Sequence, residues 1–362
     1  MQKYEFTEQT KEIRVNDKNV VLHRIRAVGN FGNVKKGELG GWIEKEENLS
    51  QLKNAWVYDD AQVYENAQVY GNAQVYENAQ ITGNAQVSGN AQIYGKAWVL
   101  GEAWVYDHAE VYGNADVLDQ ARVFGLAQVN GNATVYGNAQ VSGNAQVYDD
   151  AHVFEDVHIY GNAQVTENAQ VFGNAQVYGN ARISRNAQVY GKALVTDDAQ
   201  VSGNAQVYDG AHVYVNAHVY GNAQVYGDAW VYDDAWVYDD AQVYGKTLVY
   251  GSAQVSGNAK VYGKALVTGD AWVYDDAQVY GKAMVTDNAQ ISGIARVSGD
   301  TILDGNASVT GDFQIDEGMQ ITEKGKLIQD MRPQEEQKEM PSQEPKEKVY
   351  RPVTKKVSGP KL

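Results

Sequence analysis

Apolar and polar residues alternate along this chain in a unit of six residues. Every sixth residue from Ala55 to Ala307 is alanine, apart from Val157, Thr247 and Thr301, and a branched aliphatic residue follows each of these positions by two. The unit reads Ala-Gln-Val-Tyr-Gly-Asn. Ala and Val therefore alternate with Gln and Tyr, which is typical of a short strand with one buried face. The Gly-Asn, Asp-Asp or Gly-Lys pair that ends each unit favours a corner, because Gly and Asn accept a positive φ.

The period of six predicts a coil of strands. It excludes a helix, because it does not match 3.6 residues per turn and places glycine in every second turn. Each short strand ends in a corner that keeps the next Ala and Val pointing inward, so the chain must wind around an axis. No unit is inserted or deleted between residues 55 and 309, which disfavours a propeller, whose loops vary in length. We therefore predict an all-β fold in which successive coils pair in parallel.

The unit resembles the hexapeptide repeat of left-handed parallel β-helices, in which three units complete one triangular coil. The resemblance covers residues 55–309. Its register continues more weakly through Phe313, Ile315, Met319, Ile321 and Leu327. The resemblance implies a single-stranded left-handed β-helix, shaped as a triangular prism, in which three units of six make eighteen residues per coil. Neither the left hand nor the triangular section follows from the period itself.

The first residues carry a second resemblance. Residues 22–27, 37–43 and 47–50 are similar to the start of phage and prophage hexapeptide-repeat proteins, which are often labelled as transferases or polymer-forming proteins. This similarity implies a phage or prophage origin.

The same residues predict a small β cap at the start of the helix. A turn at Asn16 and Asp17 joins residues 13–15 to a strand over residues 20–26. Leu39, Ile43 and Leu49 fit the inward register of the repeat. Repeat proteins need such caps, because an open end exposes a strand edge and the core. We expect a cap over residues 1–36, the helix over residues 37–328, and a disordered Pro/Glu/Lys-rich tail over residues 329–362.

The charge of the chain is strongly acidic and unevenly spread. The formal net charge is −16, residues 1–54 carry 10 basic and 8 acidic side chains, and residues 329–362 carry 8 and 6. The repeats between them thus hold −20, which excludes nucleic-acid binding through phosphate neutralisation. The chain has no cysteine and no apolar run of signal-peptide or membrane length. We expect a soluble cytoplasmic protein, in the host cell cytoplasm if phage-encoded, without a membrane partner.

An enzyme is the first alternative that the resemblance raises. Hexapeptide-repeat acyltransferases place a catalytic histidine on a loop or coil edge, between subunits of a trimer. The uninterrupted repeat offers no loop that builds a pocket, so we predict no catalytic residue and no cofactor, although an acyltransferase stays open as an alternative. Four histidines occupy the outward slot usually held by Gln: His152, His158, His212 and His218.

Metal binding is the second alternative. His152 and His158 flank a corner, where the faces of a triangular prism diverge, so we expect no shared metal ion. Acidic pairs such as Asp239 and Asp240 stand at exposed corners, which favours turn formation over acid-base chemistry or calcium binding. We therefore predict no metal.

Two further functions remain open. The repeats make about 15 coils, and at about 4.8 Å per coil the predicted rod is roughly 70 Å long. A DNA duplex of that length carries on the order of 40 negative charges, about twice the charge of the repeats. A DNA mimic is therefore one alternative, and a polymer-forming rod like the bactofilins is another.

Columns of residues that recur once per coil show what each face presents. Two of them are ladders expected to stabilise the coil: Gln170, Gln188, Gln206, Gln224 and Gln242, and the nine aromatic residues 136, 154, 172, 190, 208, 226, 244, 262 and 280. One column replaces the usual Gln by other residues: Leu194, His212, Trp230, Leu248, Leu266, Met284 and Ile302. A second column beside it holds Tyr214, Tyr232 and Tyr250.

This apolar and aromatic stripe predicts a partner-binding face. Monomers seldom expose a contiguous apolar surface, and interface cores are enriched in aromatic residues. Because related prisms associate through a face, the resemblance favours a parallel homo-oligomer, with a host or phage protein as the other possible partner. The sequence thus favours a non-enzymatic scaffold or decoy that presents an acidic, Tyr- and Gln-rich rod to a protein.

Overall fold

The computed structural model describes residues 2–316, 318–322 and 326–328, of which 326–328 are described by backbone alone. The chain divides into two compact units, Met1–Asp198 and Ala199–Leu362. Strands begin every six residues from β4 (Trp56–Val57) to β48 (Gln320–Ile321). Each comprises one outward residue and the inward aliphatic residue after it. Five strands are longer: β32 (Gln224–Gly227), β35 (Gln242–Gly245), β43 (Gln290–Gly293), β46 (Ser308–Gly311) and β49 (Lys326–Ile328).

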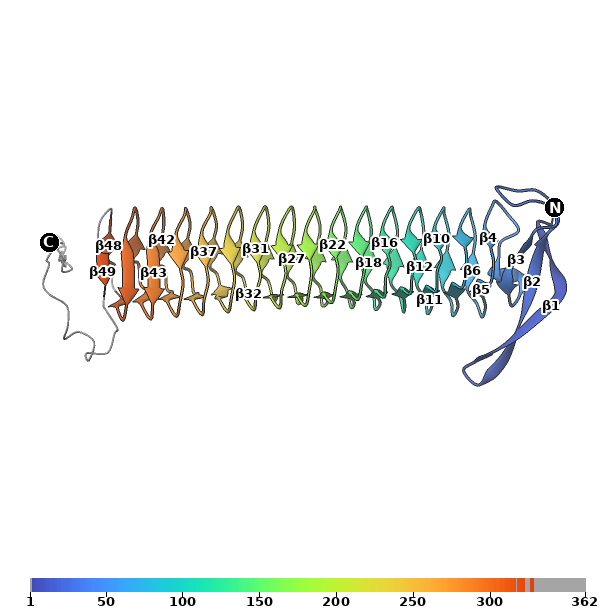
Figure 1. Ribbon diagram of the computed structural model, residues 1–362, viewed down its shortest axis with the longest axis horizontal. Coiled ribbons are helices and arrows are strands. Elements are labelled where there is room, and N and C mark those ends of the chain that lie inside the picture. Colours follow the sequence, from blue (N-terminus) through green and yellow to red (C-terminus); the bar gives the residue numbers. More distant parts are fainter. Residues whose placement is uncertain (1, 317, 323–325, 329–362) are drawn as a thin grey trace, which may run out of the picture. The chain divides into compact units, whose positions relative to one another are not determined.

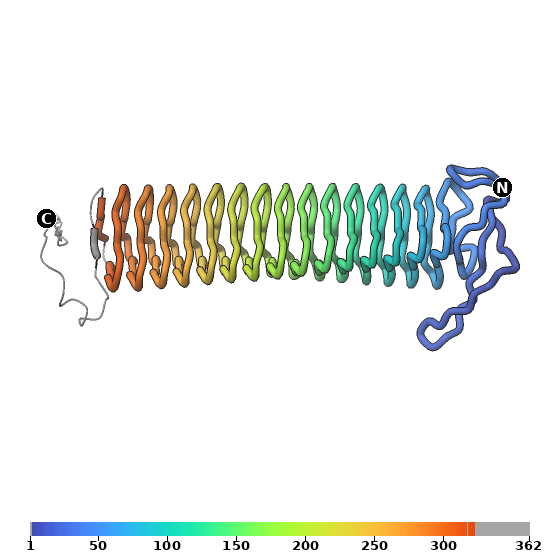
Figure 2. The backbone as a smooth tube through the Cα atoms, in the orientation of Figure 1, coloured from blue at the N-terminus to red at the C-terminus, as the bar shows by residue number. Residues whose placement is uncertain are grey.

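Each strand pairs in parallel with the third strand after it, so one coil contains three of the six-residue units. In the first unit of the structure Gln62 pairs with Gln80, and in the second Gln206 pairs with Gln224. Figure 2 shows these coils as successive turns of the backbone. The three strands of a coil belong to three parallel sheets, which confirms the predicted triangular prism. The left hand of the coil stays a prediction from the resemblance.

We name the three sheets face I, face II and face III. Face I holds β5 (Gln62–Val63) and every third strand after it, face II holds β6 (Gln68–Val69) and every third strand after it, and face III starts with β4. The inward alanines and branched aliphatic residues of the repeat are buried in each unit. In the weaker register after residue 309, Ile315 is buried, and Ile321 continues the pairing of its face with Leu303.

The positive φ predicted for the corners is present at glycine, but among the described repeat residues no asparagine has it. The first residue of a corner has a positive φ, such as 75° at Gly95 and 57° at Asp149. At several acidic corners its carboxylate accepts a hydrogen bond from the backbone N–H one coil later, as Glu155 does from Gly173 at 2.9 Å. At the second corner position, Asn222 donates to Asp240 at 2.9 Å. Acidic side chains at the corners therefore stabilise the turns through hydrogen bonds between successive coils.

The two predicted ladders are present within each unit. Gln188 donates its side-chain amide to Gln170 at 3.4 Å. In the aromatic column, the rings of Phe154 and Phe172 stack 4.9 Å apart, and those of Tyr226 and Tyr244 stack 4.8 Å apart. These contacts run along the coil axis and stabilise a core that is narrow and made of small residues.

A long hairpin precedes the coils. Strands β1 (Tyr4–Val15) and β2 (Lys18–Ala27) pair in an antiparallel ladder and are joined at Asn16 and Asp17, whose φ values of 46° and 62° fit a tight hairpin turn. This confirms the predicted turn and strand pairing, and the strands extend further than predicted (Figure 1).

The cap continues into the first coil. Strand β3 (Leu39–Ile43) pairs with β2 in antiparallel fashion and with β5 in parallel, and the short 3₁₀ helix η1 (Glu46–Asn48) follows it. Trp56 is fully buried, with its ring edge-on to Tyr4 and Phe31. The cap thus covers the side chains that the first coil would expose. The boundary at residues 36 and 37 stays a prediction, and the predicted disorder of residues 329–362 lies outside the described residues.

The prediction that Leu39 points inward is wrong, whereas Ile43 and Leu49 are buried as predicted. Leu39 is 45% exposed. It pairs with Arg26, while Trp42 pairs with Arg24, so β3 has one residue more than β2 between these two pairs. Such a bulge reverses the alternation of side chains along the strand and turns Leu39 outward.

Candidate protein-binding face

The second unit carries the predicted apolar column on face II. Backbone pairing brings six of its residues into one continuous ladder, from strand β30 (His212–Val213) to β45 (Ile302–Leu303). The members in order are His212, Trp230, Leu248, Leu266, Met284 and Ile302. The seventh predicted member, Leu194, lies in the first unit, where it pairs with Gln176.

The ladder is partly covered by its own members. Trp230 is 41% exposed, and the other five side chains are half-buried. The imidazole of His212 stacks on the indole of Trp230, with ring centroids 4.9 Å apart. Contact between neighbouring coils therefore hides one side of each residue, and the outward side remains open to a partner.

A tyrosine column lies beside it on the same strands. Tyr214, Tyr232 and Tyr250 stack in succession, with centroids 4.9 and 4.8 Å apart. Tyr214 also lies edge-on to Trp230 at 6.0 Å. Burial, followed by the neighbouring tyrosines and Asp233, raises the pKa of Tyr232 to about 12. The phenol is therefore neutral near pH 7, which favours an interface of stacked rings.

The histidine of this face is also neutral near pH 7. Burial lowers the pKa of His212 from 6.5, and the nearby Asp228 carboxylate opposes the shift. The pKa of His218 on face III shifts in the same direction, lowered by burial and opposed by Asp234. Because both pKa values are lowered, the neutral imidazole is favoured at both positions, and each ring contributes a flat, weakly polar surface.

The corners on either side of face II differ in charge. The corner that enters the face carries Lys246, Lys264 and Lys282, one in each of three successive coils. Lys282 forms an exposed ion pair with Asp300 at 3.5 Å. The corner that leaves the face carries Asp270 and Asp287 in the coils of Lys264 and Lys282. In the coil of Lys246 it carries Gly251 and Ser252. Our sequence interpretation missed this asymmetry, which becomes visible when the corner positions, like the outward slots, are compared from one coil to the next.

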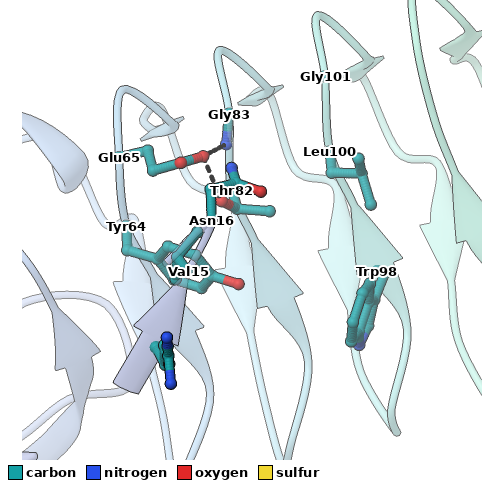
Figure 3. Close-up of a pocket in the computed structure, with 10 residues that line it drawn as sticks. Val15, Asn16, Tyr64, Glu65, Thr82, Gly83, Trp98, Leu100 and Gly101 are labelled. Atoms are coloured by element: carbon teal, nitrogen blue, oxygen red, sulfur yellow. Dashed lines mark hydrogen bonds between the residues drawn. The ribbon is translucent and has the colours of Figure 1, made fainter. Parts of the chain in front are cut away.

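One open cavity is formed by the cap and not by a loop inserted in the repeat. The tip of the β1–β2 hairpin, at Val15 and Asn16, lies against face I and encloses an open cavity of about 400 Å³ (Figure 3). Its wall includes Tyr64 and Trp98, and the Glu65 carboxylate accepts hydrogen bonds from the Thr82 hydroxyl and the Gly83 N–H, both at 2.8 Å. The hairpin reaches this far because its strands are longer than predicted.

This cavity does not gather recognisable catalytic groups. None of the ten described residues that line it is a histidine. Arg14, which also lines it, pairs with the exposed carboxylate of Asp17 at 3.0 Å. The Glu65 carboxylate is already used by two donors of the next coil.

The histidine pair considered for a metal is divided between two faces. His152 pairs with Gln170 on face I, and His158 pairs with Gln176 on face II. Within the described part of the chain, no three His, Asp or Glu side chains converge as metal ligands would. In the same part of the chain, no helix has the length and apolar character needed to cross a membrane.

Similarity to known proteins bears on this repeat. The chain resembles the YdcK β-solenoid repeat. The family model of that name matches six stretches: residues 85–101, 127–143, 175–191, 199–215, 223–239 and 277–293. The chain is also similar to a protein of Escherichia coli (strain K12) named "Uncharacterized acetyltransferase YdcK", with 38% identity over 63 residues. That match covers 16% of this chain and 19% of the relative, so the chain spans about a fifth of the relative's length.

The match to a β-solenoid repeat and the observed parallel coils indicate the same class of protein. This chain is a β-helix repeat protein. The matched stretches include residues 199–215 and 223–239, which contain His212 and Trp230 of the apolar column.

Proposed function

We propose that this chain is a non-enzymatic structural or interaction protein that presents face II of its second unit to a protein partner. The observation that carries the proposal is the continuous ladder from His212 to Ile302, in a slot that Gln fills in most other coils. Glutamine side chains of successive coils can form hydrogen bonds with one another along a ladder, and their amides also remain solvated by water. Six successive replacements by apolar or aromatic residues favour burial against another protein surface.

The proposal includes a phage or prophage setting. It is supported by the resemblance of residues 22–27, 37–43 and 47–50 to the start of phage hexapeptide-repeat proteins. In that setting the chain acts as a scaffold or a decoy in the host cell cytoplasm. Its acidic repeats favour partners with a basic surface around the apolar contact.

An acetyltransferase is the second candidate, and it is favoured by the name of the similar Escherichia coli protein. Such an enzyme must bind an acyl donor, and the cavity beneath the hairpin is one place in the described structure where a donor could enter. Calorimetry with acetyl-coenzyme A separates the two functions. We expect no heat of binding, and micromolar affinity would establish the enzyme in place of the interaction protein.

A triple substitution tests the binding face. Trp230→Gln, Leu248→Gln and Leu266→Gln together restore the residue that this slot usually holds, so the fold should be retained. We expect the variant to lose self-association in sedimentation velocity, or to lose a partner identified with the wild-type chain. The matched control replaces Trp236 and Trp272, both 41% exposed on face III, by Gln.

The control variant should behave as wild type in both assays. The proposal is overturned if the triple variant keeps its assembly state and its partners. It is also overturned if the face III control loses as much association as the face II variant.

A further inference from the structure

Opposite charges border the apolar ladder on the two long sides of face II in two successive coils, those of Leu266 and Met284. Lys246, Lys264 and Lys282 form a basic row at one corner. These three side chains are exposed. Lysine is rare in the acidic repeats, and three lysines one coil apart repel one another along the row. The opposite corner carries the exposed carboxylates of Asp270 and Asp287 in the coils of Lys264 and Lys282.

From this arrangement we infer that face II of the second unit binds the same face of a second copy, with the two coil axes parallel and related by a twofold axis along them. The inference rests on the proposed function and names the partner of that face. A twofold axis along the coil direction places Lys264 and Lys282 of each copy against Asp270 and Asp287 of the other. A twofold axis across the coils makes the copies antiparallel and places lysine opposite lysine, which is unfavourable.

The spacing along the axis supports the parallel arrangement. Lys264 and Asp270 flank the same strand, β39 (Leu266–Val267), and Lys282 and Asp287 flank the next strand of the face, β42 (Met284–Val285). In a parallel dimer these partners lie at the same height. Because both copies repeat at about 4.8 Å, a contact made in one coil recurs in the next.

The apolar residues also meet suitable partners in this dimer. The twofold axis places the first outward slot of each strand against the second slot of the other copy. Trp230 then faces Tyr232, Leu248 faces Tyr250, and Leu266 faces Thr268. Rings and aliphatic side chains therefore meet around Trp230 and Leu248, and no charged residue enters the centre of the contact between Trp230 and Met284. In the last coil of the ladder Ile302 faces Asp304, which marks the end of the apolar contact.

The size of the face predicts a modest affinity. Six coils at about 4.8 Å and a face six residues, or about 20 Å, wide give roughly 600 Å² per copy. Stable interfaces bury about 800 Å² per partner. The dimer should therefore form at micromolar concentrations.

Charge exchange between the two corners tests the inference. Lys264→Asp and Asp270→Lys each create two like-charge contacts in a parallel homodimer, so each variant alone should dimerise at least tenfold more weakly than wild type. In an equimolar mixture both contacts become favourable again. We expect a mixed dimer with an affinity within about threefold of wild type, measured by sedimentation velocity with one variant fluorescently labelled. Circular dichroism and melting curves confirm that both variants fold.

Three results would overturn the inference: a wild-type chain that stays monomeric at 100 µM, single variants that dimerise like wild type, or a mixture that associates no better than its components. If the wild type is monomeric while the face II triple variant loses a foreign partner, the proposed function stands and the parallel dimer does not. If that triple variant loses nothing, both are wrong.

Discussion

The imidazole of His212 lies flat on the indole of Trp230, with the ring planes inclined by only 6°. Each ring comes from a different coil and is held there by backbone pairing of the two residues. The contact hides the imidazole from water and lowers the pKa of His212, against the opposing charge of Asp228. Protonation of His212 is therefore less favourable in the folded chain than in the unfolded chain.

This shift predicts the direction of one pH effect. An unfolded histidine titrates near pH 6.5. Because the folded pKa is lower, the contribution of His212 to stability is present above pH 6.5 and is lost as the pH falls through the folded pKa. We expect the melting temperature of wild type to fall, relative to His212→Gln, between pH 7.5 and pH 5. Melting curves of the two proteins that stay parallel over this range would contradict the assignment.

A buried lysine in the cap predicts a second pH effect. The Lys3 ammonium donates to the Ala55 carbonyl at 2.7 Å and lies 5.1 Å from the centre of the Phe31 ring. Burial lowers the pKa of Lys3 to about 8. The stability that Lys3 contributes is therefore present above its unfolded pKa and is lost as the pH falls through about 8.

The variant Lys3→Met isolates this contribution. Relative to the variant, wild type should become more stable as the pH rises from 8 to 10, measured as the difference between their melting temperatures. The comparison cancels the titration of the tyrosines, which both proteins share. Lys35→Met is the control, because Lys35 is an exposed lysine of the N-terminal cap. Its melting temperature should follow that of wild type over the same pH range. A difference between wild type and Lys3→Met that is independent of pH would show that Lys3 is not buried as described.

Val215 occupies a corner that is costly for valine. Its φ of 59° lies in the left-handed region, where the equivalent residues of the next two coils are Asp233 and Gly251. A β-branched residue is strained there by about 1 kcal/mol or more. We expect Val215→Gly to raise the free energy of unfolding by about 1 kcal/mol in urea denaturation.

The reverse substitution at the equivalent corner position two coils later, Gly251→Val, gives the control. A Cβ on Gly251 would lie 3.0 Å from the backbone nitrogen of Gly269, and its φ is 70°. Gly251→Val should therefore destabilise the coil. A loss of stability in Val215→Gly would mean that contacts of the valine side chain outweigh its backbone strain.

The coil could be predicted from the sequence because one physical rule repeats without interruption. Each inward alanine and valine, and each corner glycine or aspartate, specifies the same local conformation. Because each coil has eighteen residues, every residue is predicted to pair with the residue eighteen positions later, as His212 does with Trp230. The cap lacks this redundancy. Leu39 faces outward because of a bulge between β2 and β3, and a single extra residue leaves no periodic signal.

The candidate face was predicted in part. Its apolar ladder is a column of the repeat and is visible in the sequence. The lysine row from Lys246 to Lys282 is equally periodic but was missed, because corner residues were interpreted as turn formers alone. The cavity beneath Val15 and Asn16 could not be predicted, since it depends on the length and tilt of the hairpin and not on any repeat.

Cysteine footprinting of one coil tests the central claim most directly, because the chain contains no cysteine of its own. Gln242→Cys, Leu248→Cys and Gln254→Cys place one thiol on faces I, II and III in successive half-buried outward slots. Alkylation rates are measured in dilute protein and in the assembled or partner-bound state. We predict that assembly slows the reaction of Leu248→Cys at least fivefold and leaves the other two rates unchanged. Equal rates for Leu248→Cys in both states, or equal protection of all three thiols, would contradict the assignment of face II as the binding surface.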